Sequence, residues 1–487
     1  MVIRNKKNDI LTYLEDTSNI KGSASSLYIP RNPEELKEII KEASDKKIAL
    51  TLQGARTGTT GGCVPLEGSA ISTEGLNRII DINHKAKEAK LEPGVTLKDL
   101  ESELNKFGLS FKAQPTESLA FTGGAVSTCA SGTRGFRYGS IRNYIKELSI
   151  ILANGSLIRI KRGEISARKR KFSFSLDDKS FHFNLPAYNM PSVKTQAGYF
   201  IKDDMDLIDL FIGSEGTLGA VTELTISVQN VSSEIFDMVV FFKKEADALS
   251  FVDRIHEMKQ NHKLTPSSLE FFDANALDFL KTNYSHILPS HYAVYFEQEA
   301  ENNDKDKLID LWSKIIESCG ASPDKVWFAD TKPERKKIYE FRHKLPQLIN
   351  EFLRAKQQTK LSTDIAVPSG NFRAMYSFYK ETAKDTGINY VNFGHIGENH
   401  LHFNFLPAND IEHKKANLAI LRFAEKAVSL GGTVSAEHGI GKIKKHLLEI
   451  MYNKRHIEEM AMLKRYFDPL CILGIDNIFE KELLKKI

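Results

Sequence analysis

Three histidines fall within eight residues of the segment NFGHIGENHLHFN, at positions 395, 400 and 402. A glycine and an asparagine between them favour a turn, and the alternating stretch LHFNF that follows is typical of a strand. Such a turn could bring His395 and His402 together from its two sides, but strand alternation puts His400 and His402 on one face and equally nominates His400. A single histidine here would more often be hydrogen-bonded or solvated, so a metal site needs a further ligand.

The segment GTVSAEHGIGK, residues 432–442, offers that ligand as Glu437, with His438 beside it and glycines after it. Two imidazoles and one carboxylate form the ligand set of an open catalytic zinc site, and they also suit iron or manganese. The alternative is an exposed turn without a ligand role. Together the two segments predict a metal that keeps coordination positions open for substrate oxygens.

The elements that must bring these residues together change along the chain. Up to about residue 230, short apolar runs such as IALTLQG alternate with glycine-rich turns and amphipathic stretches such as PEELKEIIKEASDKK, which is an α/β or α+β pattern. From about residue 231, longer strand and helix units alternate and predict a separate domain with one sheet covered by helices. From about residue 413 the chain is again helical. The length of 487 residues suits two or three domains.

Three glycine-rich segments lie in the first part of the chain, at residues 53–65, 114–139 and 206–226. In the first, QGARTGTTGGCVP, unshielded backbone N–H groups and threonine hydroxyls could bind an anion, although a structural turn is equally compatible. Its spacing matches neither the G-x-x-x-x-G-K-[ST] loop nor the G-x-G-x-x-G fingerprint. Loops as long as the second are usually functional. All three together favour a large, elongated ligand that carries phosphate.

The order and the amino-acid sequences of these segments resemble those of the flavoprotein family of vanillyl-alcohol-oxidase type. The resemblance is strongest to its D-lactate dehydrogenases, glycolate oxidase flavin subunits and D-2-hydroxyglutarate dehydrogenases. The resemblance runs from about residue 25 to the end. It implies an α+β fold with a two-part FAD-binding domain in residues 1–230. Residues 231–412 would form an α/β substrate or cap domain that carries the histidines, with an antiparallel sheet covered by helices. Residues 413–487 would form a helical segment that packs back on the FAD domain.

The resemblance also implies FAD, with its pyrophosphate on the first glycine-rich loop. Members that attach FAD covalently carry a histidine in this loop, whereas Arg56 and Thr57 stand near that place here, so we expect dissociable FAD. Near the C-terminus, LGID replaces a common asparagine, proline and glycine run, so Gly474 offers the flavin no side chain. The residues expected to contact FAD are Gly54, Ala55, Arg56, Thr57, Gly58, Thr59, Thr60, Gly61, Gly62, Pro115, Thr116, Gly123, Gly124, Ser127, Thr128, Gly132 and Val221.

In the histidine segment, the family pattern H-x-G-D-G-N-x-H matches at the two outer histidines and departs at residues 398–400. His400, which stands where relatives carry asparagine, would then support the ligands or be a bystander. A substrate lysine of some relatives aligns with Ser362, and Lys360 is displaced by two positions, so the substrate's identity does not transfer. The roles implied by the resemblance are a divalent metal on His395, His402 and Glu437, a catalytic base at His438, and a substrate carboxylate held by Arg342.

These expectations describe an FAD-dependent, metal-assisted enzyme that oxidises a D-2-hydroxy acid of the D-lactate, glycolate or D-2-hydroxyglutarate class to the 2-oxo acid. The hydride would pass to flavin N5. One alternative is an FAD oxidase of another alcohol that uses oxygen. A metal hydrolase would leave the glycine-rich segments unused, and a noncatalytic flavin electron-transfer subunit would leave Glu437 and His438 unused.

Composition bears on the partners and the compartment. A formal net charge of +4 from 67 basic and 63 acidic residues gives little reason to expect nucleic acid. Four scattered cysteines form no C-x-x-C pair and fit a reducing compartment, so electrons would leave through a quinone, a carrier protein or an iron–sulfur subunit. We expect no signal peptide and no transmembrane segment, hence a cytoplasmic protein, with a peripheral place at the inner membrane face as an alternative. The basic run at residues 161–171 is most simply a solvated surface, and a homodimer is the candidate assembly.

Overall fold

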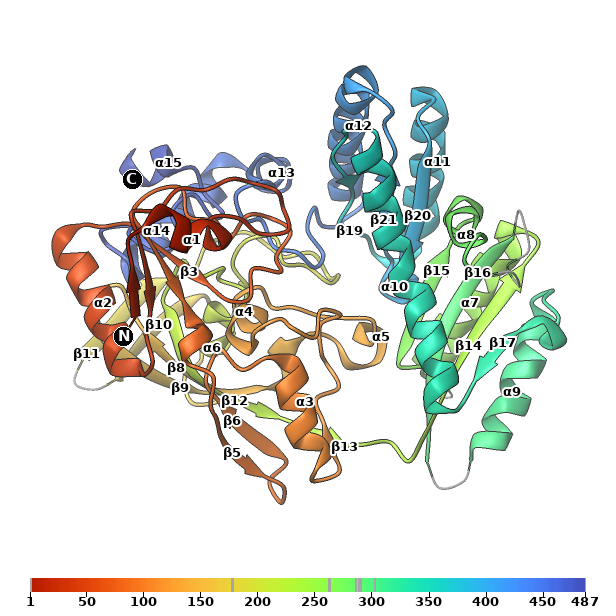
Figure 1. Cartoon of the computed structure of the whole chain (residues 1–487), viewed down its shortest axis with the longest axis horizontal. Helices are drawn as coiled ribbons and strands as arrows, with labels where there is room; N and C mark the ends of the chain where they lie inside the picture. Colours follow the sequence, from red (N-terminus) through yellow and green to blue (C-terminus); the bar gives the residue numbers. More distant parts are fainter. Residues whose placement is uncertain are drawn as a thin grey trace.

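The computed structural model of the protein describes residues 2–176, 179–261, 264–284, 287, 291–301 and 304–486. The chain forms two lobes (Figure 1). The first lobe holds both chain ends, and the second is built from the elements between β14 and α12. Helices and antiparallel sheets are present in both, which confirms the α+β expectation.

The first lobe begins with a four-stranded sheet of order β1-β2-β4-β3, in which β2, β4 and β3 run parallel. Its elements are β1 Val2–Arg4, β2 Ser26–Ile29, β3 Leu50–Gln53, β4 Ser69–Ser72 and the covering helix α2 Pro33–Lys46. Helix α2 begins where its sequence predicts, because the Asn32 side chain accepts a hydrogen bond from the Glu35 N–H and Pro33 occupies the first turn. Leu36 of its apolar face packs in one cluster with Leu50 of β3. The first glycine-rich segment begins at the last residue of β3.

A second, antiparallel sheet of order β5-β6-β12-β8-β9 forms the rest of this lobe. Buried and half-buried residues alternate along β12, as expected of a strand with one face on a core. The sheet strands are β5 Ile79–Asn83, β6 Glu88–Leu91, β8 Ile145–Ile151, β9 Leu157–Lys161 and β12 Ala220–Ser227. Other elements of the lobe are α3 Leu97–Asn105, β7 Leu109–Ser110, α4 Thr122–Ser127, α5 Gly135–Tyr138, β10 Lys171–Leu176, β11 Lys179–Asn184, α6 Ile208–Phe211 and β13 Gln229–Asn230.

The second lobe, or cap, has one antiparallel sheet of order β17-β14-β16-β15-β20-β21-β18, with β19 also paired to β21. Side chains alternate along β14, so Phe236 and Val240 face one helical layer while Val239 and Phe241 face the other. The strands are β14 Glu234–Phe242, β15 Ser268–Phe272, β16 Tyr292–Ala300, β17 Trp327–Ala329, β18 Leu361–Ser362, β19 Ile365–Ala366, β20 Tyr390–Gly394 and β21 His400–Phe405. One layer contains α7 Glu245–Gln260, α9 Lys305–Ser318, α11 Phe372–Thr386 and α12 Asp410–Ser429, and the other contains α8 Ala274–Leu280 and α10 Lys332–Ala355.

Helix α12 packs against both lobes. Its buried residues Ala416, Ala419 and Phe423 lie in the cap core with Phe403 of β21, because its apolar face fits the sheet beside α11. Ala424 of the same helix lies in the core of the first lobe, with Leu421 and Val428 packed against that core. The boundary expected after residue 412 lies in the first turn of this helix and stays a prediction.

The returning chain pairs with the first sheet. The Leu50 N–H donates to the Ile472 carbonyl at 2.7 Å, and the Gly474 N–H donates to the Leu50 carbonyl at 2.8 Å. The helices of this part are α13 Lys445–Met451, α14 Lys454–Phe467 and α15 Lys481–Lys486. Residues 432–442, which link α12 to α13, consequently pass from the cap to the first lobe and carry Glu437 and His438 between them.

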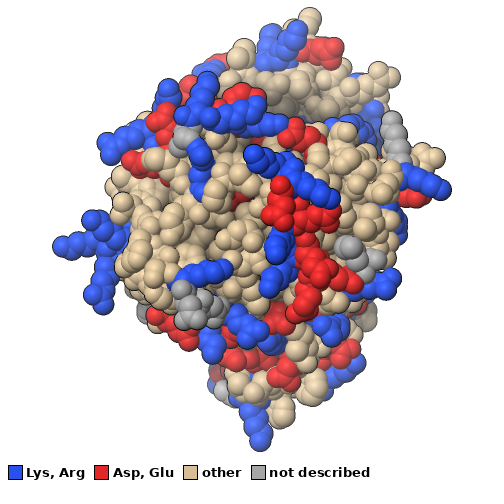
Figure 2. All heavy atoms as spheres, turned by 90° about the vertical axis from the view of Figure 1, so that its left-hand side faces the viewer, with Lys and Arg blue, Asp and Glu red and all other residues tan. Residues whose placement is uncertain are grey.

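Surface charge is mixed. On the face drawn in Figure 2, Lys and Arg side chains are interspersed with Asp and Glu and with broad uncharged areas. Within the basic run, Arg162 pairs with Asp209 and Arg170 pairs with Asp203, so two of its charges serve local structure. In the described ranges, the structure contains no helix that is both long and apolar enough to cross a membrane.

Candidate active site

The histidine segment forms the turn between β20 and β21. Phe393 pairs with His402 across the two strands, and Asn399 closes the turn in the left-handed region at φ 52°. Gly394 lies at φ 128°, and a Cβ there would lie 3.0 Å from the His402 ring. The bare glycine backbone thus permits the close packing that leaves the His395 and His402 ring centres 5.6 Å apart.

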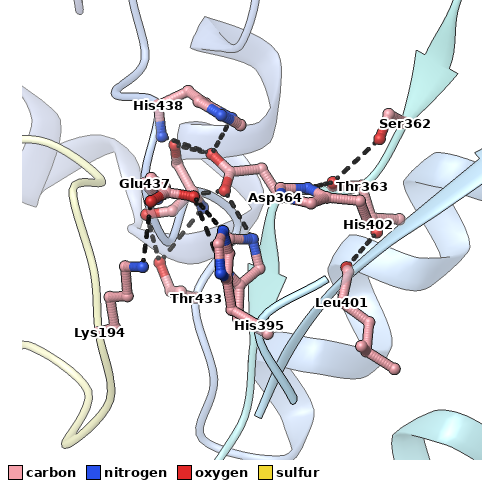
Figure 3. A network of polar contacts seen from close by, with 12 residues as sticks. Lys194, Ser362, Thr363, Asp364, His395, Leu401, His402, Thr433, Glu437 and His438 are labelled. Atoms are coloured by element: carbon pink, nitrogen blue, oxygen red, sulfur yellow. Dashed lines mark hydrogen bonds and ion pairs between the residues drawn. The ribbon is translucent and has the colours of Figure 1, made fainter. Parts of the chain in front are cut away.

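Glu437 reaches the same point from the segment between the lobes (Figure 3). His395, His402 and Glu437 each offer one ligand atom, and these atoms all lie within 4.8 Å of one another. His395 Nε2 lies 3.4 Å from Glu437 Oε2. Tetrahedral bonds of about 2.0–2.2 Å put ligand atoms roughly 3.3–3.5 Å apart, so this donor set fits a zinc-sized ion after small shifts.

The second nitrogen of each histidine has a neighbour that orients the ring. His395 Nδ1 lies 3.3 Å from Oε1 of Glu270, a carboxylate fully buried within β15. His402 Nδ1 lies 3.3 Å from the carbonyl oxygen of Thr363. Outer partners of this kind select the tautomer and direct the remaining nitrogen at an ion.

Burial and mutual contact shift the pKa values of the three groups. Burial and the neighbouring imidazoles put the pKa of His402 well below its usual value, so this ring is neutral and its lone pair is available. Burial would raise the pKa of Glu437, but Lys194 and His395 hold it well below the usual value. Burial would lower the pKa of His395, but Glu437 and Glu270 raise it to about 9, so an ion would displace a proton from this ring.

Glu437 is also anchored by the first lobe. Its Oε1 accepts a hydrogen bond from Ser131 Oγ at 3.0 Å and lies 3.3 Å from Lys194 Nζ. Lys194 is nearly buried and lies 2.9 Å from Glu398 Oε2 on the histidine turn. With Oε1 engaged by these donors, Oε2 is the oxygen that faces His395.

His438 lies beside the ligand cluster. Its Nδ1 is 3.2 Å from Asp364 Oδ2, and its ring stacks 5.7 Å from the His402 ring, centre to centre. The side chain keeps 35% of its surface exposed. An imidazole that is held through Nδ1 and is partly open can present Nε2 to a substrate as a base.

Arg342 approaches the cluster from α10. Its Nε lies 2.9 Å from Oε2 and 3.1 Å from Oε1 of Glu270, the same carboxylate that faces His395. Its pKa is raised, because Glu270 and Glu437 outweigh the cost of burial. The Nε edge of the guanidinium therefore serves Glu270, and its outer nitrogens are the part that could hold a substrate carboxylate.

His400 lies behind the proposed ligands. Its side chain is fully buried, and its Nε2 lies 3.1 Å from Asp364 Oδ1. Its Nδ1 is 3.9 Å from Glu437 Oε2, and burial lowers its pKa. The structure thus places His400 against Asp364, which lies outside the ligand set of His395, His402 and Glu437.

The glycine-rich segments contact one another and residues 432–442, which carry Glu437 and His438. A Cβ on Gly54 would lie 3.5 Å from Gly124 Cα, so the first two segments are in contact. The Thr60 carbonyl accepts a hydrogen bond from the Lys442 N–H at 2.9 Å, and Thr60 Oγ1 donates to the His438 carbonyl at 3.3 Å. The first segment therefore lies directly beside the proposed base.

The third segment joins through Glu215. Its N–H donates to the Ser127 carbonyl at 2.8 Å, and its carboxylate accepts the N–H groups of Ile440 and the following glycine. Asn477 donates to the carbonyls of Gly62 and Glu215 at 2.7 and 3.1 Å. Asn477, three positions beyond Gly474, thus links the C-terminal part of the chain to the first and third glycine-rich segments.

The first lobe leaves unshielded backbone and an unsatisfied donor where a phosphate group is expected. A Cβ on Gly124 would meet no atom within 4 Å, and one on Gly58 would meet only Asp16 at 3.9 Å. Arg56 lies over the Tyr13 ring at 4.2 Å, and its buried Nη1 has no hydrogen-bond partner among the described residues. These features fit the pyrophosphate of FAD. The other expected contacts lie in the turn before α4 (Pro115, Thr116), in or just after α4 (Gly123, Ser127, Thr128), against Gln114 (Gly132) and on β12 (Val221).

Three buried charges at the site were missed by sequence reasoning: Asp364, Lys194 and Glu270. A signal existed for Glu270, because it interrupts the apolar strand SLEFF and a buried charge needs a partner. Asp364 stands between two very short strands and Lys194 in an irregular loop, where sequence pattern does not report burial. Their partners are 36 or more positions away, so only the tertiary fold reveals them.

Comparison with known proteins assigns both lobes to families of FAD-linked enzymes. The FAD binding domain family matches residues 24–161, and the family of C-terminal domains of FAD linked oxidases matches residues 236–475. A D-lactate dehydrogenase of Archaeoglobus fulgidus is 29% identical, over 93% of this chain and 90% of its own. The glycolate oxidase subunit GlcD of Bacillus subtilis is 28% identical, over 98% and 94%, and a D-2-hydroxyglutarate dehydrogenase of Stutzerimonas stutzeri is 25% identical, over 95% and 92%.

Solved structures show the same fold at lower identity. A 4-ethylphenol oxidase from Gulosibacter chungangensis superposes with a TM-score of 0.70 at 16% identity, covering 99% of this chain and 95% of its own. An alkyldihydroxyacetonephosphate synthase superposes with a TM-score of 0.67 at 16% identity, covering 97% and 81%. With both domain families matched in order along the chain, the protein belongs to the FAD-linked oxidoreductases, and its relatives include enzymes named D-lactate dehydrogenase and D-2-hydroxyglutarate dehydrogenase.

Proposed function

We propose that the protein oxidises a D-2-hydroxy acid to the corresponding 2-oxo acid with FAD and a divalent metal. The observation that carries the proposal is the convergence of His395, His402 and Glu437 beside His438. The relatives' names support the substrate class, which spans D-lactate, glycolate and D-2-hydroxyglutarate.

His395, His402 and Glu437 would hold the metal, and the three glycine-rich segments would hold dissociable FAD. When bound, FAD would accept a hydride from the substrate's C2 at its N5 atom, and the ion would polarise the substrate oxygens. Zinc fits the donor set first, with manganese or iron as alternatives. The lone pair of neutral His402 and the charge of Glu437 suit a cation at this point.

His438 would accept the proton of the substrate hydroxyl at Nε2. Its Nδ1 lies 3.2 Å from Asp364 Oδ2, and 35% of its side-chain surface is exposed. Removal of one hydride and one proton from the alcohol leaves a carbonyl at C2, so the atoms and charges balance. A positioned base of this kind contributes about 10²–10⁴-fold to the rate.

Arg342 would fix the substrate carboxylate through the outer edge of its guanidinium. Because Glu270 holds the opposite edge, the guanidinium cannot turn freely. A carboxylate pinned at one end and a hydroxyl placed at the other would determine which face of C2 meets the flavin. Such an arrangement would select one enantiomer, and the names of the relatives point to the D form.

In this proposal each part of the chain has a separate role. Residues 1–230 bind FAD, the cap provides His395, His402 and Arg342, and the chain after α12 brings Glu437 and His438 to the junction. The electron acceptor of such an enzyme would be a quinone, a carrier protein or an iron–sulfur subunit. A cytoplasmic location fits such an enzyme, and a peripheral membrane position would suit a quinone acceptor.

The experiment that tests the proposal is a panel of D- and L-2-hydroxy acids with a dye acceptor, combined with metal analysis of the same sample. We expect a D acid to bleach the flavin absorbance and reduce the dye, with about one metal per chain. A protein that shows no flavin absorbance even after added FAD would refute it. Stopped-flow reoxidation separates the alternative oxidase, which would be reoxidised by air faster than by a quinone.

A further inference from the structure

We propose that Asp364 is a positioning residue that couples the proposed base to the proposed metal ligands. This inference rests on the proposed function and deepens it. Asp364 is 4% exposed and stands between β18 and β19, both of which pair with the histidine strand β21. It therefore occupies the cap sheet directly behind the ligand cluster.

Each carboxylate oxygen of Asp364 lies close to several polar groups of the site. Oδ1 lies 3.1 Å from the Glu437 N–H and 3.1 Å from His400 Nε2. Oδ2 lies 2.7 Å from the His438 N–H and 3.2 Å from His438 Nδ1. Ser435 Oγ and Lys444 Nζ also approach Oδ2, at 2.9 and 2.5 Å. One buried side chain thus contacts both the backbone that presents Glu437 and the ring of His438.

The contact with Nδ1 determines what the His438 ring can do. A carboxylate accepts and does not donate, so in the neutral ring this contact favours the proton on Nδ1 and leaves the lone pair on Nε2. A positive ring, formed once Nε2 has taken the substrate proton, would be stabilised by the same carboxylate. Asp364 touches neither substrate nor cofactor in this arrangement, and it acts through His438.

A purely architectural role is the competing explanation, because the N–H groups of Glu437 and His438 alone would also bind Asp364. A double-mutant cycle of Asp364→Asn and His438→Ala separates the two. If Asp364 acts through His438, its replacement matters only while His438 is present. Asp385→Asn, at an exposed position of α11, is the matched control and is expected to behave as wild type.

The readout is the rate at which a reactive hydroxy acid bleaches the flavin without oxygen, after flavin and metal per chain have been measured. We expect Asp364→Asn to keep both and to lose at least about 10²-fold in rate, with KM changed less than about threefold. Added to His438→Ala, it should cost less than about threefold more. Losses that multiply, or loss of flavin or metal from folded Asp364→Asn, would overturn the proposal. If Asp364→Asn does not fold, Asp364→Glu replaces it in the same cycle.

A second measurement needs no turnover. In protein labelled with ¹⁵N-histidine, the signal missing from His438→Ala identifies His438. We expect Nδ1 to be protonated in wild type and the tautomer to change in Asp364→Asn, and an unchanged tautomer would overturn the proposal. Wild type that is not reduced by any hydroxy acid would refute the proposed function alone, since this spectrum still decides the role of Asp364.

Discussion

Glu270 offers a test of the metal site that does not depend on substrate. The carboxylate is fully buried and lies 3.3 Å from His395 Nδ1 and 2.9 Å from Arg342 Nε. Burial alone would raise its pKa, but Arg342 and His395 lower it to about 2, so Glu270 is charged at neutral pH. The change Glu270→Gln removes that charge with little change in shape.

The loss of charge should weaken the metal site. A carboxylate behind a ligating histidine raises the ring's basicity, and loss of such a partner typically costs 10–100-fold in metal affinity, or about 1.4–2.7 kcal/mol. We also expect a fall of about 1–3 kcal/mol in the free energy of unfolding, because the carboxamide still accepts one hydrogen bond but leaves the Arg342 charge unpaired. Both effects follow from the same two contacts.

The assay is titration of metal-free protein with Zn²⁺ against a chromogenic chelator, on samples whose circular dichroism matches wild type. Glu340→Gln is the control, because Glu340 lies on α10 with a mostly exposed side chain and pairs only loosely with Lys336 at 3.7 Å. A Zn²⁺ affinity of Glu270→Gln within about twofold of wild type would refute the assignment of Glu270 as support for a ligand.

Three other predictions concern separate parts of the chain. His395→Ala and His402→Ala should lose bound metal and His400→Ala should keep it within about threefold, as measured by elemental analysis; equal loss at all three would contradict the ligand assignment. Lys464→Met should lose about 3–5 kcal/mol in chemical denaturation, because it leaves the fully buried Asp468 without its ion pair, whereas exposed Lys454→Met on the same helix should change little; similar losses would argue against this reasoning. Burial raises the pKa of Glu215 from 4.5 to about 7, so the folded chain binds this proton more tightly. The unfolding free energy of wild type relative to Glu215→Gln should therefore fall as pH rises from about 4.5 to about 7 and then level off, and a difference that does not depend on pH would show that Glu215 is ionised throughout.

Much of the fold follows from local sequence. The helix α2, with Pro33 near its start, and the strand β12 are set by neighbouring residues, so the sequence alone predicts them. The packing of α12 does not follow in this way. Phe423 packs on the cap sheet and Ala424 packs in the core of the first lobe, and no local pattern says which sheet an amphipathic helix will cover.

The candidate site divides in the same way. The sequence by itself determined the chemical types: two imidazoles beside a turn, a Glu–His pair framed by glycines, and glycine-rich loops that can approach a phosphate. Only the tertiary structure decided which groups meet. In the folded chain, Glu437 contacts His395, and His400 contacts Asp364. Lys194, from the first lobe, contacts Glu437. The physical reason is that ligand types and turns are properties of neighbouring residues, whereas the partners of a buried charge are fixed by packing between segments far apart in the chain.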